Sequence, residues 1–472
     1  MYKAMSRALP IILLLLHVSG VFSQTINQKL AKAYSAFMGD SQLRQAIASL
    51  YVIDARTNKV VFDRSSTIGM ADASTQKIIT AATAYEILGK EFRYETIFST
   101  AGNIDSGVLN GSIYIRGSGD PTLGSWRWAQ TKEEAVLGRV LNAFRSLRIK
   151  NFLSVIVDGR GWEGEVIPDG WIWQDLGNYY GAGSGVLNWR ENQYDLILKP
   201  GVKQGDPVSI LRTRPALYSY NLISNLVSGP VNSGDNAYIY FSTQGSTGFI
   251  RGSVPVQRDS FVISGAMPSA RDQLIATLLD SLSSVGMHTK LSPLYLDSRR
   301  GQAPDAGRLK EFHREVSPPL DSMVFWFLRK SINLYGESLV KTLGFTKTQT
   351  ATTDAGIVEI KKFWKSKGIT ETELRMYDGS GLSPQNRITT HAQVQVLAYA
   401  RKQPWFTGFY LALPEYNAMK MKSGTIAGVK GFCGYHKSTT GQEYIFSFLV
   451  NNYNGSSSTL VTKMYDVLNL LK

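Results

Sequence analysis

The sequence predicts an α/β domain that is interrupted by a large β-rich insertion. Strand-like and helical segments alternate before about residue 97, and helical periodicity returns in the C-terminal third of the chain. Between them, short β-like runs alternate with glycine-rich turns and helices are few. No period of about 20 to 50 residues recurs, which argues against a solenoid. We therefore expect one domain formed by residues 24–97 and 300–472, with residues 98–299 inserted into it.

The N-terminal part of this domain predicts helices and a hairpin. Apolar residues have helical spacing in residues 28–38 and 42–50. The apolar runs 48–54 and 60–62 are separated by a polar turn and predict a β-hairpin. A further helix begins at Ser74, and its apolar face consists of Ile78, Ile79, Ala82, Tyr85 and Leu88.

Apolar periodicity also predicts the strands and helices of the insertion and of the C-terminal part. Inside the insertion we expect strands over residues 111–116 and 153–158 and helices over 132–147 and 271–285. After the insertion, apolar periodicity predicts helices over residues 321–330, 338–343, 357–367 and 392–401. The chain then predicts a β-meander and a closing helix, over residues 420–424, 431–436, 444–450 and 458–471.

The first 23 residues have the layout of a secretory signal peptide. Lys3 and Arg7 precede an apolar run, and the small-residue pattern at residues 21–23 suits cleavage. The run is too short to cross a bilayer comfortably, although an uncleaved anchor or a buried N-terminal helix stays an alternative. A periplasmic location is therefore expected.

The chain carries 51 Lys and Arg residues against 37 Asp and Glu residues, a formal net charge of +14. Removal of Lys3 and Arg7 with the signal peptide lowers this to +12. An exported protein does not meet chromosomal DNA, so we expect no nucleic-acid partner. The positive charge instead favours contact with an anionic envelope polymer or a membrane surface.

The scarcity of cysteine and histidine excludes several kinds of site. The one cysteine, Cys433, rules out an internal disulfide and a multi-thiolate metal site, and it falls in a strand expected to be buried. The chain has five histidines, which are not closely paired, so we expect no metal and no cofactor. A Ser-His-Asp triad is disfavoured for the same reason, and Gly117-Ser-Gly-Asp-Pro is interpreted as a turn rather than a nucleotide loop.

A serine enzyme without histidine needs another base, and lysine can take that role. On a helix, Ser at position i and Lys at i+3 share a face, and a dry cationic site can keep the amine neutral. Two such tetrads occur, Ser74 with Lys77 and Ser338 with Lys341. Only Ser74 begins a helix, where its own N–H lacks an intrahelical partner and can help to bind an oxyanion.

Two further motifs follow the first tetrad in the chain. Ser331 and Asn333 come just after a predicted helix and offer a hydroxyl and an amide. Lys422, Ser423, Gly424 and Thr425 lie on a predicted strand. There the glycine lets a substrate backbone approach the strand edge, Lys422 and Ser423 can bind a carboxylate, and the N–H of Thr425 can supply a second oxyanion donor.

The order Ser-x-x-Lys, Ser-x-Asn, Lys-Ser-Gly resembles that of the penicillin-recognising serine enzymes. Ser74 and Ser331 are 257 positions apart, a gap too long for a compact β-lactamase, and Lys422 follows 91 positions later. The chain thus resembles the class C low-molecular-mass penicillin-binding proteins, the D-alanyl-D-alanine carboxypeptidase/endopeptidase family. The resemblance extends to residues 109–123, 170–182 and 378–386 and to Gly434-Tyr435.

The resemblance implies a fold and a set of roles. The fold is a penicillin-binding-protein or β-lactamase-like transpeptidase domain, an antiparallel sheet flanked by helices, that carries a large insertion. Ser74 is then the nucleophile that forms an acyl-enzyme with peptidoglycan stem peptides or β-lactam antibiotics, and Lys77 is its base. Ser331 and Lys422 pass protons to the leaving D-alanine, while Asn333 positions the substrate. Repulsion between the two amines is expected to help keep Lys77 neutral.

The sequence departs from the family pattern at several places. Ile332 stands where the middle motif often has Asp, and Ser423 stands where Thr is common. Pro384 and Ala427 occupy positions where relatives have Arg and Gln, residues associated with the free end of the stem peptide's diamino acid. Two residues are candidate substitutes in that role, with Asp158 as the acidic partner of the amine and Arg387 as the cation.

Alternatives of other classes stay open at this point. The changes at Pro384 and Ala427 fit a catalytically silent peptidoglycan-binding protein on the same fold. A β-lactamase is distinguished by a short acyl-enzyme lifetime. The balance of carboxypeptidase and endopeptidase activity and the oligomeric state do not follow from the sequence.

Overall fold

The computed structural model describes residues 24–162, 164–243, 245–297 and 308–472. The predicted signal peptide and the predicted boundary near residue 299 lie outside these residues. Among the described residues, no helix is both long and apolar enough to span a membrane.

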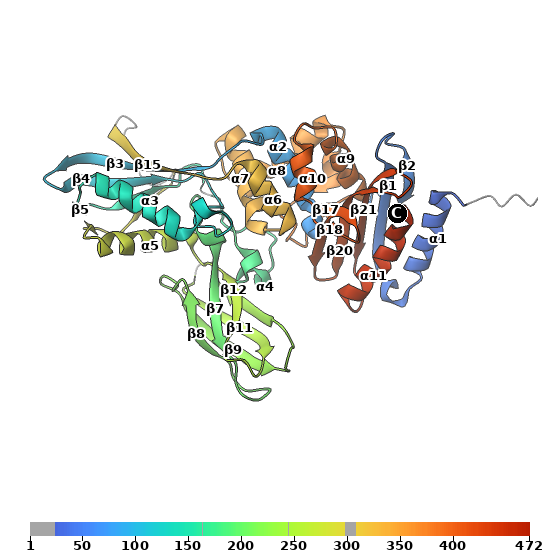
Figure 1. The fold of residues 1–472 in the computed structure, drawn as a ribbon, viewed down its shortest axis with the longest axis horizontal. Coiled ribbons are helices and arrows are strands. Elements are labelled where there is room, and N and C mark those ends of the chain that lie inside the picture. Colours follow the sequence, from blue (N-terminus) through green and yellow to red (C-terminus); the bar gives the residue numbers. More distant parts are fainter. Residues whose placement is uncertain (1–23, 163, 244, 298–307) are drawn as a thin grey trace, which may run out of the picture.

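An antiparallel six-stranded sheet is formed by the two terminal parts of the chain, as the sequence predicts (Figure 1). The N-terminal and C-terminal parts of the chain are paired in this sheet. Strand β1 lies next to β21, with Ile47 opposite Asn451 and Asp54 opposite Tyr444. The sheet has the order β18-β19-β20-β21-β1-β2, with bounds β1 (Ile47–Asp54), β2 (Val60–Arg64), β18 (Glu415–Tyr416), β19 (Met419–Ile426), β20 (Val429–Lys437) and β21 (Glu443–Asn451). The predicted hairpin and meander are therefore confirmed, and Cys433 is buried in β20.

The prediction of a helix over residues 42–50 is wrong. Residues 42–50 form a short 3-10 turn (Ser41–Leu43) and then the start of β1. Strand β1 is covered on both faces, so six of its eight residues are buried. A fully buried strand has a continuous apolar run, and such a run cannot be distinguished from a buried helix by periodicity.

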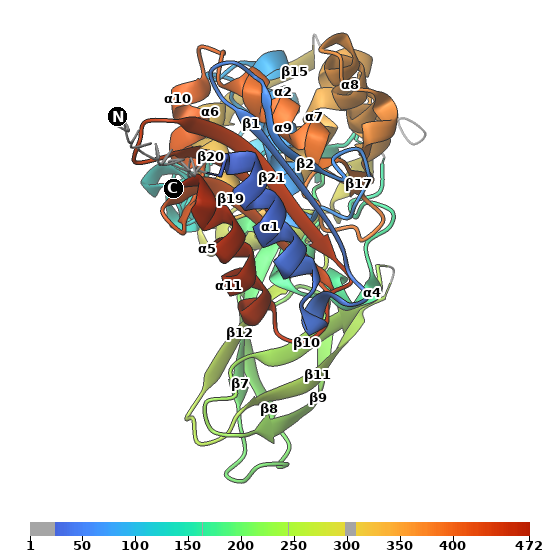
Figure 2. The same cartoon turned by 90° about the vertical axis from the view of Figure 1, so that its right-hand side faces the viewer.

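Two helices from opposite ends of the chain cover one face of the sheet. Helices α1 (Ile26–Met38) and α11 (Ser457–Leu468) lie side by side (Figure 2). They bury a shared core against the sheet, formed by residues such as Leu30, Phe37, Phe448, Leu460 and Met464.

The other face carries the helices that build the site. They are α2 (Lys77–Leu88), α6 (Leu320–Arg329), α7 (Asn333–Thr348), α8 (Thr353–Ser366), α9 (Thr390–Ala400) and α10 (Phe406–Ala412). Helix α2 lies at the centre and contacts α6, α7, α8 and α9. Every residue from Lys77 to Tyr85 is buried, because neighbours surround the helix on all sides. The prediction that α2 buries only one apolar face is therefore wrong. Helix α7 begins at Asn333, five residues before its apolar periodicity starts.

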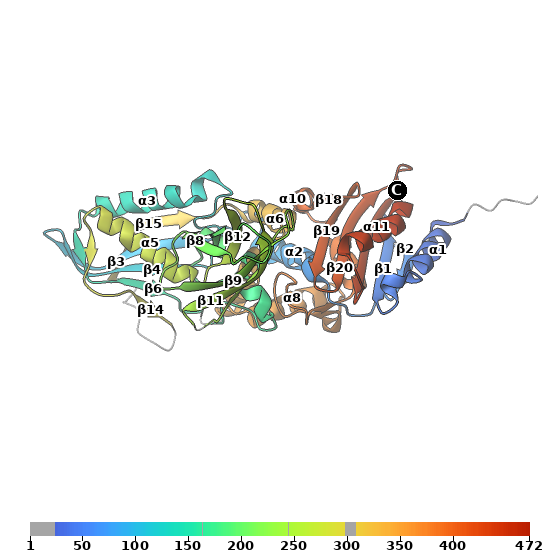
Figure 3. The same ribbon diagram turned by 90° about the horizontal axis from the view of Figure 1, so that it is seen from below.

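A seven-stranded mixed sheet contains strands of the inserted segment together with β15 (Leu309–Val316), which lies after the predicted end of the segment at residue 299. Helices α3 (Glu133–Ser146) and α5 (Ala270–Ser284) lie side by side on it (Figure 3) and bury Val140, Phe144 and Leu278. The other strands are β3 (Glu95–Asp105), β4 (Val108–Arg116), β5 (Asn151–Phe152), β6 (Val155–Asp158), β13 (His288–Thr289) and β14 (Leu294–Leu296). Because β15 pairs with β3, the chain leaves this sheet beside the strand by which it enters.

A smaller lobe, formed by strands β7 to β12, projects from this region (Figure 1). It consists of two three-stranded sheets, with orders β12-β7-β8 and β10-β11-β9, that enclose a core including Leu196, Ile239 and Ile250. Its strands are β7 (Gln193–Lys199), β8 (Ser209–Arg214), β9 (Asn221–Gly229), β10 (Asn236–Phe241), β11 (Thr247–Pro255) and β12 (Phe261–Ala266). The short helix α4 (Trp173–Leu176) contacts β10.

Candidate active site

Ser74 and Lys77 lie on two consecutive turns at the start of the central helix. Ser74 is the second residue of a 3-10 turn (Ala73–Gln76) that continues into α2 at Lys77. Ala73 has a left-handed φ of 48°, which turns the chain sharply ahead of the serine. The Nζ of Lys77 donates a hydrogen bond to Ser74 Oγ at 2.8 Å. The amine is thus within direct proton-transfer distance of the hydroxyl.

The amine of Lys77 is fully buried and has three acceptors. Besides Ser74 it donates to Asn333 Oδ1 at 2.6 Å and to the carbonyl of Ser380 at 2.7 Å. Burial lowers the pKa of Lys77 to about 7, although the carboxyl groups of Asp378, Glu337 and Asp72 act in the opposite direction. A substantial fraction of this amine is therefore neutral near neutral pH and able to accept a proton.

The second amine, Lys422, lies on β19 and reaches the hydroxyl of Ser331. Its Nζ donates to Ser331 Oγ at 2.9 Å and to the carbonyl of Ser423 at 2.8 Å. Ser331 joins α6 to α7 with a left-handed φ of 58°. Burial, followed by repulsion from Lys77, holds the pKa of Lys422 well below its usual range.

The sequence predicts that repulsion between the two amines helps to keep Lys77 neutral, but the structure shows the effect on the other amine. The repulsion lowers the pKa of Lys422, whereas the low pKa of Lys77 results from burial.

Gly424 lets β19 run directly against the turn that carries Ser74. A Cβ at this position would lie 2.6 Å from the carbonyl oxygen of Asp72 and 3.0 Å from the backbone nitrogen of Ser74. Thr425, the next residue, is exposed and accepts a hydrogen bond from Lys430 at its hydroxyl. The contact of β19 with this turn brings Thr425 and Ser74 to the same cavity.

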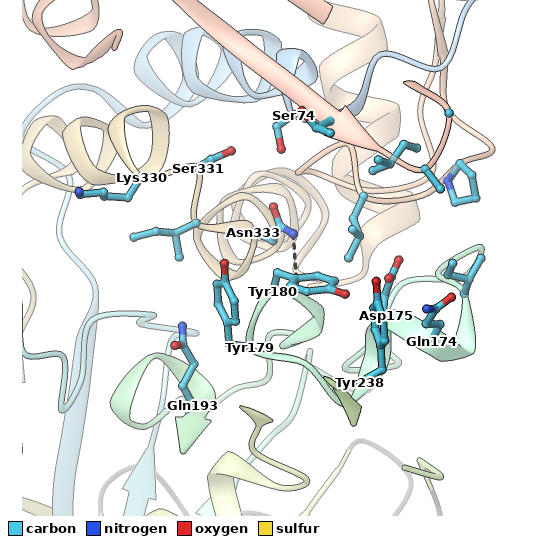
Figure 4. Close-up of a pocket in the computed structure, with 18 of the residues that line it drawn as sticks. Ser74, Gln174, Asp175, Tyr179, Tyr180, Gln193, Tyr238, Lys330, Ser331 and Asn333 are labelled. Atoms are coloured by element: carbon cyan, nitrogen blue, oxygen red, sulfur yellow. Dashed lines mark hydrogen bonds between the residues drawn. The ribbon is translucent and has the colours of Figure 1, made fainter. Parts of the chain in front are cut away.

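Asn333 is the first residue of α7 and joins two walls of the site. Its Oδ1 accepts from Lys77, and its Nδ2 donates to the carbonyl of Tyr180 at 2.8 Å (Figure 4). One turn further on, both carboxyl oxygens of Glu337 accept from the N–H of Gly379. Ser380, which follows, supplies the carbonyl that receives Lys77.

A cavity of about 700 Å³ opens above these groups. Ser74, Ser331, Asn333 and Thr425 line it together with Pro384 and Ala427, two of the positions that depart from the family pattern. Another wall comes from the inserted segment and includes Gln174, Asp175, Tyr179, Tyr180, Gln193 and Tyr238 (Figure 4). The site is therefore closed by residues far from the three motifs in sequence.

The structure does not bring Asp158 or Arg387 to this cavity. The carboxylate of Asp158 accepts two hydrogen bonds from the Arg160 guanidinium, at 2.8 and 2.7 Å, and one from the Arg160 N–H. The guanidinium of Arg387 donates to the carbonyls of Pro384 and Asn386. The second tetrad is also elsewhere: Ser338 and Lys341 are buried, and Lys341 donates to the carbonyls of Glu165, Val166 and Ser184.

Two residues of the site were not among the sequence candidates. Asp175 lines the cavity, and in the sequence it lies within the 170–182 resemblance, where a lone acid in an irregular segment belongs to no motif. Glu337 lies four residues after Asn333, which is the helical spacing that places it on the same face, and this spacing was the available signal. Within the described residues, no cluster of three or more His, Cys, Asp or Glu could hold a metal.

Comparison with known proteins matches nearly the whole chain. The model of the D-Ala-D-Ala carboxypeptidase 3 (S13) family matches residues 30–469. The chain is 22% identical to the D-alanyl-D-alanine carboxypeptidase DacB of Haemophilus influenzae over 427 residues, which cover 86% of this chain and 85% of that protein. It is 23% identical to a D-alanyl-D-alanine carboxypeptidase of Actinomadura sp. over 462 residues, 92% of this chain and 83% of that one.

The fold is shared with a solved structure. The crystal structure of penicillin-binding protein 4 (dacB) from Haemophilus influenzae superposes with a TM-score of 0.79 at 20% identity, and the match covers 93% of this chain and 99% of that chain. The same protein in complex with a β-lactam gives a TM-score of 0.74 at 19% identity, covering 93% and 98%. The chain therefore belongs to the D-Ala-D-Ala carboxypeptidase 3 (S13) family of serine-type carboxypeptidases.

Proposed function

We propose that Ser74 attacks the carbonyl of the D-Ala-D-Ala bond in peptidoglycan stem peptides and forms an acyl-enzyme. The observation that carries this is the 2.8 Å hydrogen bond between Lys77 Nζ and Ser74 Oγ at the edge of the 700 Å³ cavity. A buried amine with a pKa of about 7 accepts the hydroxyl proton as Oγ attacks, because its neutral form is populated.

The remaining groups complete one turnover. As Oγ bonds to the carbonyl carbon, the N–H groups of Ser74 and Thr425 stabilise the oxyanion. The proton taken by Lys77 is returned through the Ser331 hydroxyl and Lys422 to the leaving nitrogen, the C–N bond breaks, and D-alanine departs. Water then attacks the ester, takes the place of Ser74 on the carbonyl carbon, and returns the proton to Oγ. The Lys422–Ser331 hydrogen bond of 2.9 Å supports this proton path.

The same steps acylate Ser74 with a penicillin. The strained β-lactam amide takes the place of the D-Ala-D-Ala bond, but its nitrogen stays attached to the acyl group after the C–N bond breaks. A leaving group that cannot diffuse away blocks the approach of water, so a long-lived acyl-enzyme is expected. A short-lived one would instead indicate a β-lactamase.

The free amine of the stem peptide's diamino acid fits Asp175 better than Asp158. Asp175 lines the cavity, and burial raises the pKa of its carboxyl, although Tyr180 partly offsets this. A cationic amine that approaches Asp175 would favour the charged form of the carboxyl group and gain an ion pair. Asp158 already has its partner in Arg160.

We also propose that the chain is exported, with residues 1–23 as a signal peptide, and acts in the periplasm. Its positive charge supports contact with an anionic envelope polymer or a membrane surface.

Labelling with a fluorescent penicillin tests the assignment of the nucleophile. Ser74→Ala should abolish covalent labelling, whereas Ser338→Ala, in the second tetrad, should keep it. The Ser338 hydroxyl is buried and hydrogen-bonded to the Ser184 hydroxyl, so its loss should affect stability and not chemistry. Mass spectrometry of products from purified muropeptides then distinguishes loss of one D-alanine from cleavage of a cross-link. Folded protein that neither labels nor releases D-alanine would contradict the proposal.

A further inference from the structure

The outer face of the sheet β10-β11-β9 is unusually rich in exposed aromatic and apolar side chains. Inward-facing residues such as Ile239, Ile250 and Leu226 form the core of the β7–β12 lobe. The alternate positions point outward and present Ile223, Val227, Tyr238, Tyr240, Phe249 and Arg251, together with Asn225. Contiguous apolar patches on a protein surface mark binding sites more often than chance exposure does.

The strand register arranges these side chains in two adjacent rows. Tyr240 lies opposite Phe249, and Phe249 lies opposite Ile223 on the third strand. Beside this row, Tyr238 lies opposite Arg251, and Arg251 opposite Asn225. Directly opposed side chains on one face are about 5 Å apart, so each row is a continuous strip. The guanidinium of Arg251 also lies 5.5 Å from the ring centre of Tyr240.

This face is continuous with the catalytic cavity. Tyr238 belongs to the face and also lines the cavity (Figure 4). The ring of Trp173, itself exposed, packs edge-on against Tyr240 with 4.9 Å between ring centres. Trp173 begins α4, whose next residues Gln174 and Asp175 line the cavity. Figure 2 shows the strands β9, β10 and β11 below the catalytic domain, with α4 at their upper end.

We propose that the outer face of β10-β11-β9, with Trp173, binds the glycan strand of peptidoglycan while the attached stem peptide occupies the catalytic cavity. This inference rests on the proposed function, because the stem peptide is the substrate that enters the cavity. The polymer that carries the peptide must leave the cavity mouth along one of its walls. The wall that Tyr238 forms leads onto the aromatic face.

The chemistry of the face fits a chain of sugars. Pyranose rings present polarised C–H bonds on their faces, and these stack on the negative faces of aromatic rings. Arg251 and Asn225 supply hydrogen-bond donors for hydroxyl and acetamido oxygens. A protein partner is the competing occupant, and it would not be displaced by a glycan.

Binding to insoluble peptidoglycan sacculi tests this directly, with the double variant Tyr240→Ala, Phe249→Ala. We expect the variant to cosediment with sacculi about tenfold more weakly than the wild type. Release of D-alanine from a free pentapeptide, which has no sugar, should change less than about twofold. Peptide-free glycan strands should compete with sacculi for the wild-type protein.

The matched control is Tyr218→Ala, which removes an exposed aromatic ring from the same lobe outside this face. It should leave both measurements unchanged. Penicillin labelling of Ser74 and the melting temperature verify that each variant is folded, and the single variant Phe249→Ala replaces the double variant if that one does not fold.

Three outcomes would overturn the glycan assignment while leaving the proposed function intact. They are unchanged binding of the variant to sacculi, an equal loss on sacculi and on free pentapeptide, and failure of peptide-free glycan to compete. A wild-type protein that hydrolyses neither substrate and binds no penicillin would instead contradict the proposed function itself.

Discussion

Both carboxyl oxygens of Glu337 accept hydrogen bonds from the N–H of Gly379, at 3.2 and 3.0 Å. This contact joins α7 to the segment that contains Gly379 and Ser380. The carbonyl of Ser380 accepts a hydrogen bond from the amine of Lys77. Burial raises the pKa of Glu337 to about 8, and the hydrogen bond from the Gly379 N–H acts in the opposite direction.

The hydrogen bond between Gly379 and Glu337 makes Glu337 a positioning residue for Lys77, and two substitutions of Glu337 test this role. Glu337→Gln keeps an amide oxygen for Gly379 and should retain penicillin acylation within about threefold of the wild type. Glu337→Leu leaves the buried N–H without an acceptor, which costs about 1–3 kcal/mol, and should lower both the melting temperature and the acylation rate. Equal behaviour of the two variants would show that the hydrogen bond does not position Lys77.

The pKa of Lys77 predicts how acylation depends on pH. Below about 7 the amine is protonated and cannot accept the proton of Ser74, so the rate should fall about tenfold for each further pH unit and level off above pH 8. Rates of fluorescent-penicillin acylation at a series of pH values measure this. Lys77→Arg, which stays protonated, should be about 10²–10⁴-fold slower throughout. A flat profile in the wild type would mean that another group is the base.

The close approach at Gly424 predicts an effect on catalysis that exceeds the effect on folding. In Gly424→Ala the new methyl group would meet the backbone of Asp72, Ser74 and Thr75, and backbone cannot move aside as a flexible side chain does. Such overpacking costs about 1–3 kcal/mol and shifts β19 away from Ser74, so acylation should fall at least about tenfold.

The control is Gly138→Ala, at an open position in α3 where the substitution should be neutral or slightly stabilising. If Gly424→Ala acylates as fast as Gly138→Ala, β19 does not supply an oxyanion donor.

The two acids, Asp175 and Asp158, predict opposite results in a substrate comparison. Asp175→Asn should lower kcat/KM about tenfold for stem peptides whose diamino acid has a free amine, because an ion pair in the cavity is lost. It should have little effect on the same peptides with that amine acetylated. Asp158→Asn should leave the ratio of the two substrates unchanged, because Asp158 pairs with Arg160 outside the cavity. The reverse pattern would restore Asp158 as the recognition residue.

The sequence predicts which candidate catalytic groups lie together because the expected chemistry requires fixed residue types at local spacings. Ser74 and Lys77 lie within one tetrad, and Ser331 and Asn333 within one tripeptide. The fold then brings these two motifs and Lys422 to one cavity. The same local spacing in Ser338 and Lys341 lies away from the cavity, and there the lysine donates hydrogen bonds from α7 to carbonyls of the inserted segment. The spacing cannot distinguish a catalytic amine from a structural one.

The parts that the sequence does not predict depend on long-range packing. Asp175 reaches the cavity because α4 lies against the β7–β12 lobe, and nothing in its local sequence encodes that position. Helix α2 appears amphipathic in sequence, but its polar positions Lys77, Thr80 and Thr83 are buried and hydrogen-bonded. The helix predicted over residues 42–50 is not formed, because β1 is buried on both faces and its sequence has no alternation of apolar and polar residues.

The pairing of β1 with β21 has a consequence for the moment at which the enzyme becomes active during synthesis. The chain emerges from its N-terminus, so Ser74 and Lys77 exist long before the last strands are made. Lys422, Gly424 and Thr425 are held in place by β20 and β21, and β21 in turn is aligned by β1. A chain interrupted before Glu443 therefore carries Ser74, Lys77 and Lys422 but lacks β21, the strand that joins β20 to β1. We therefore expect acylating activity only after β21 has paired with β1.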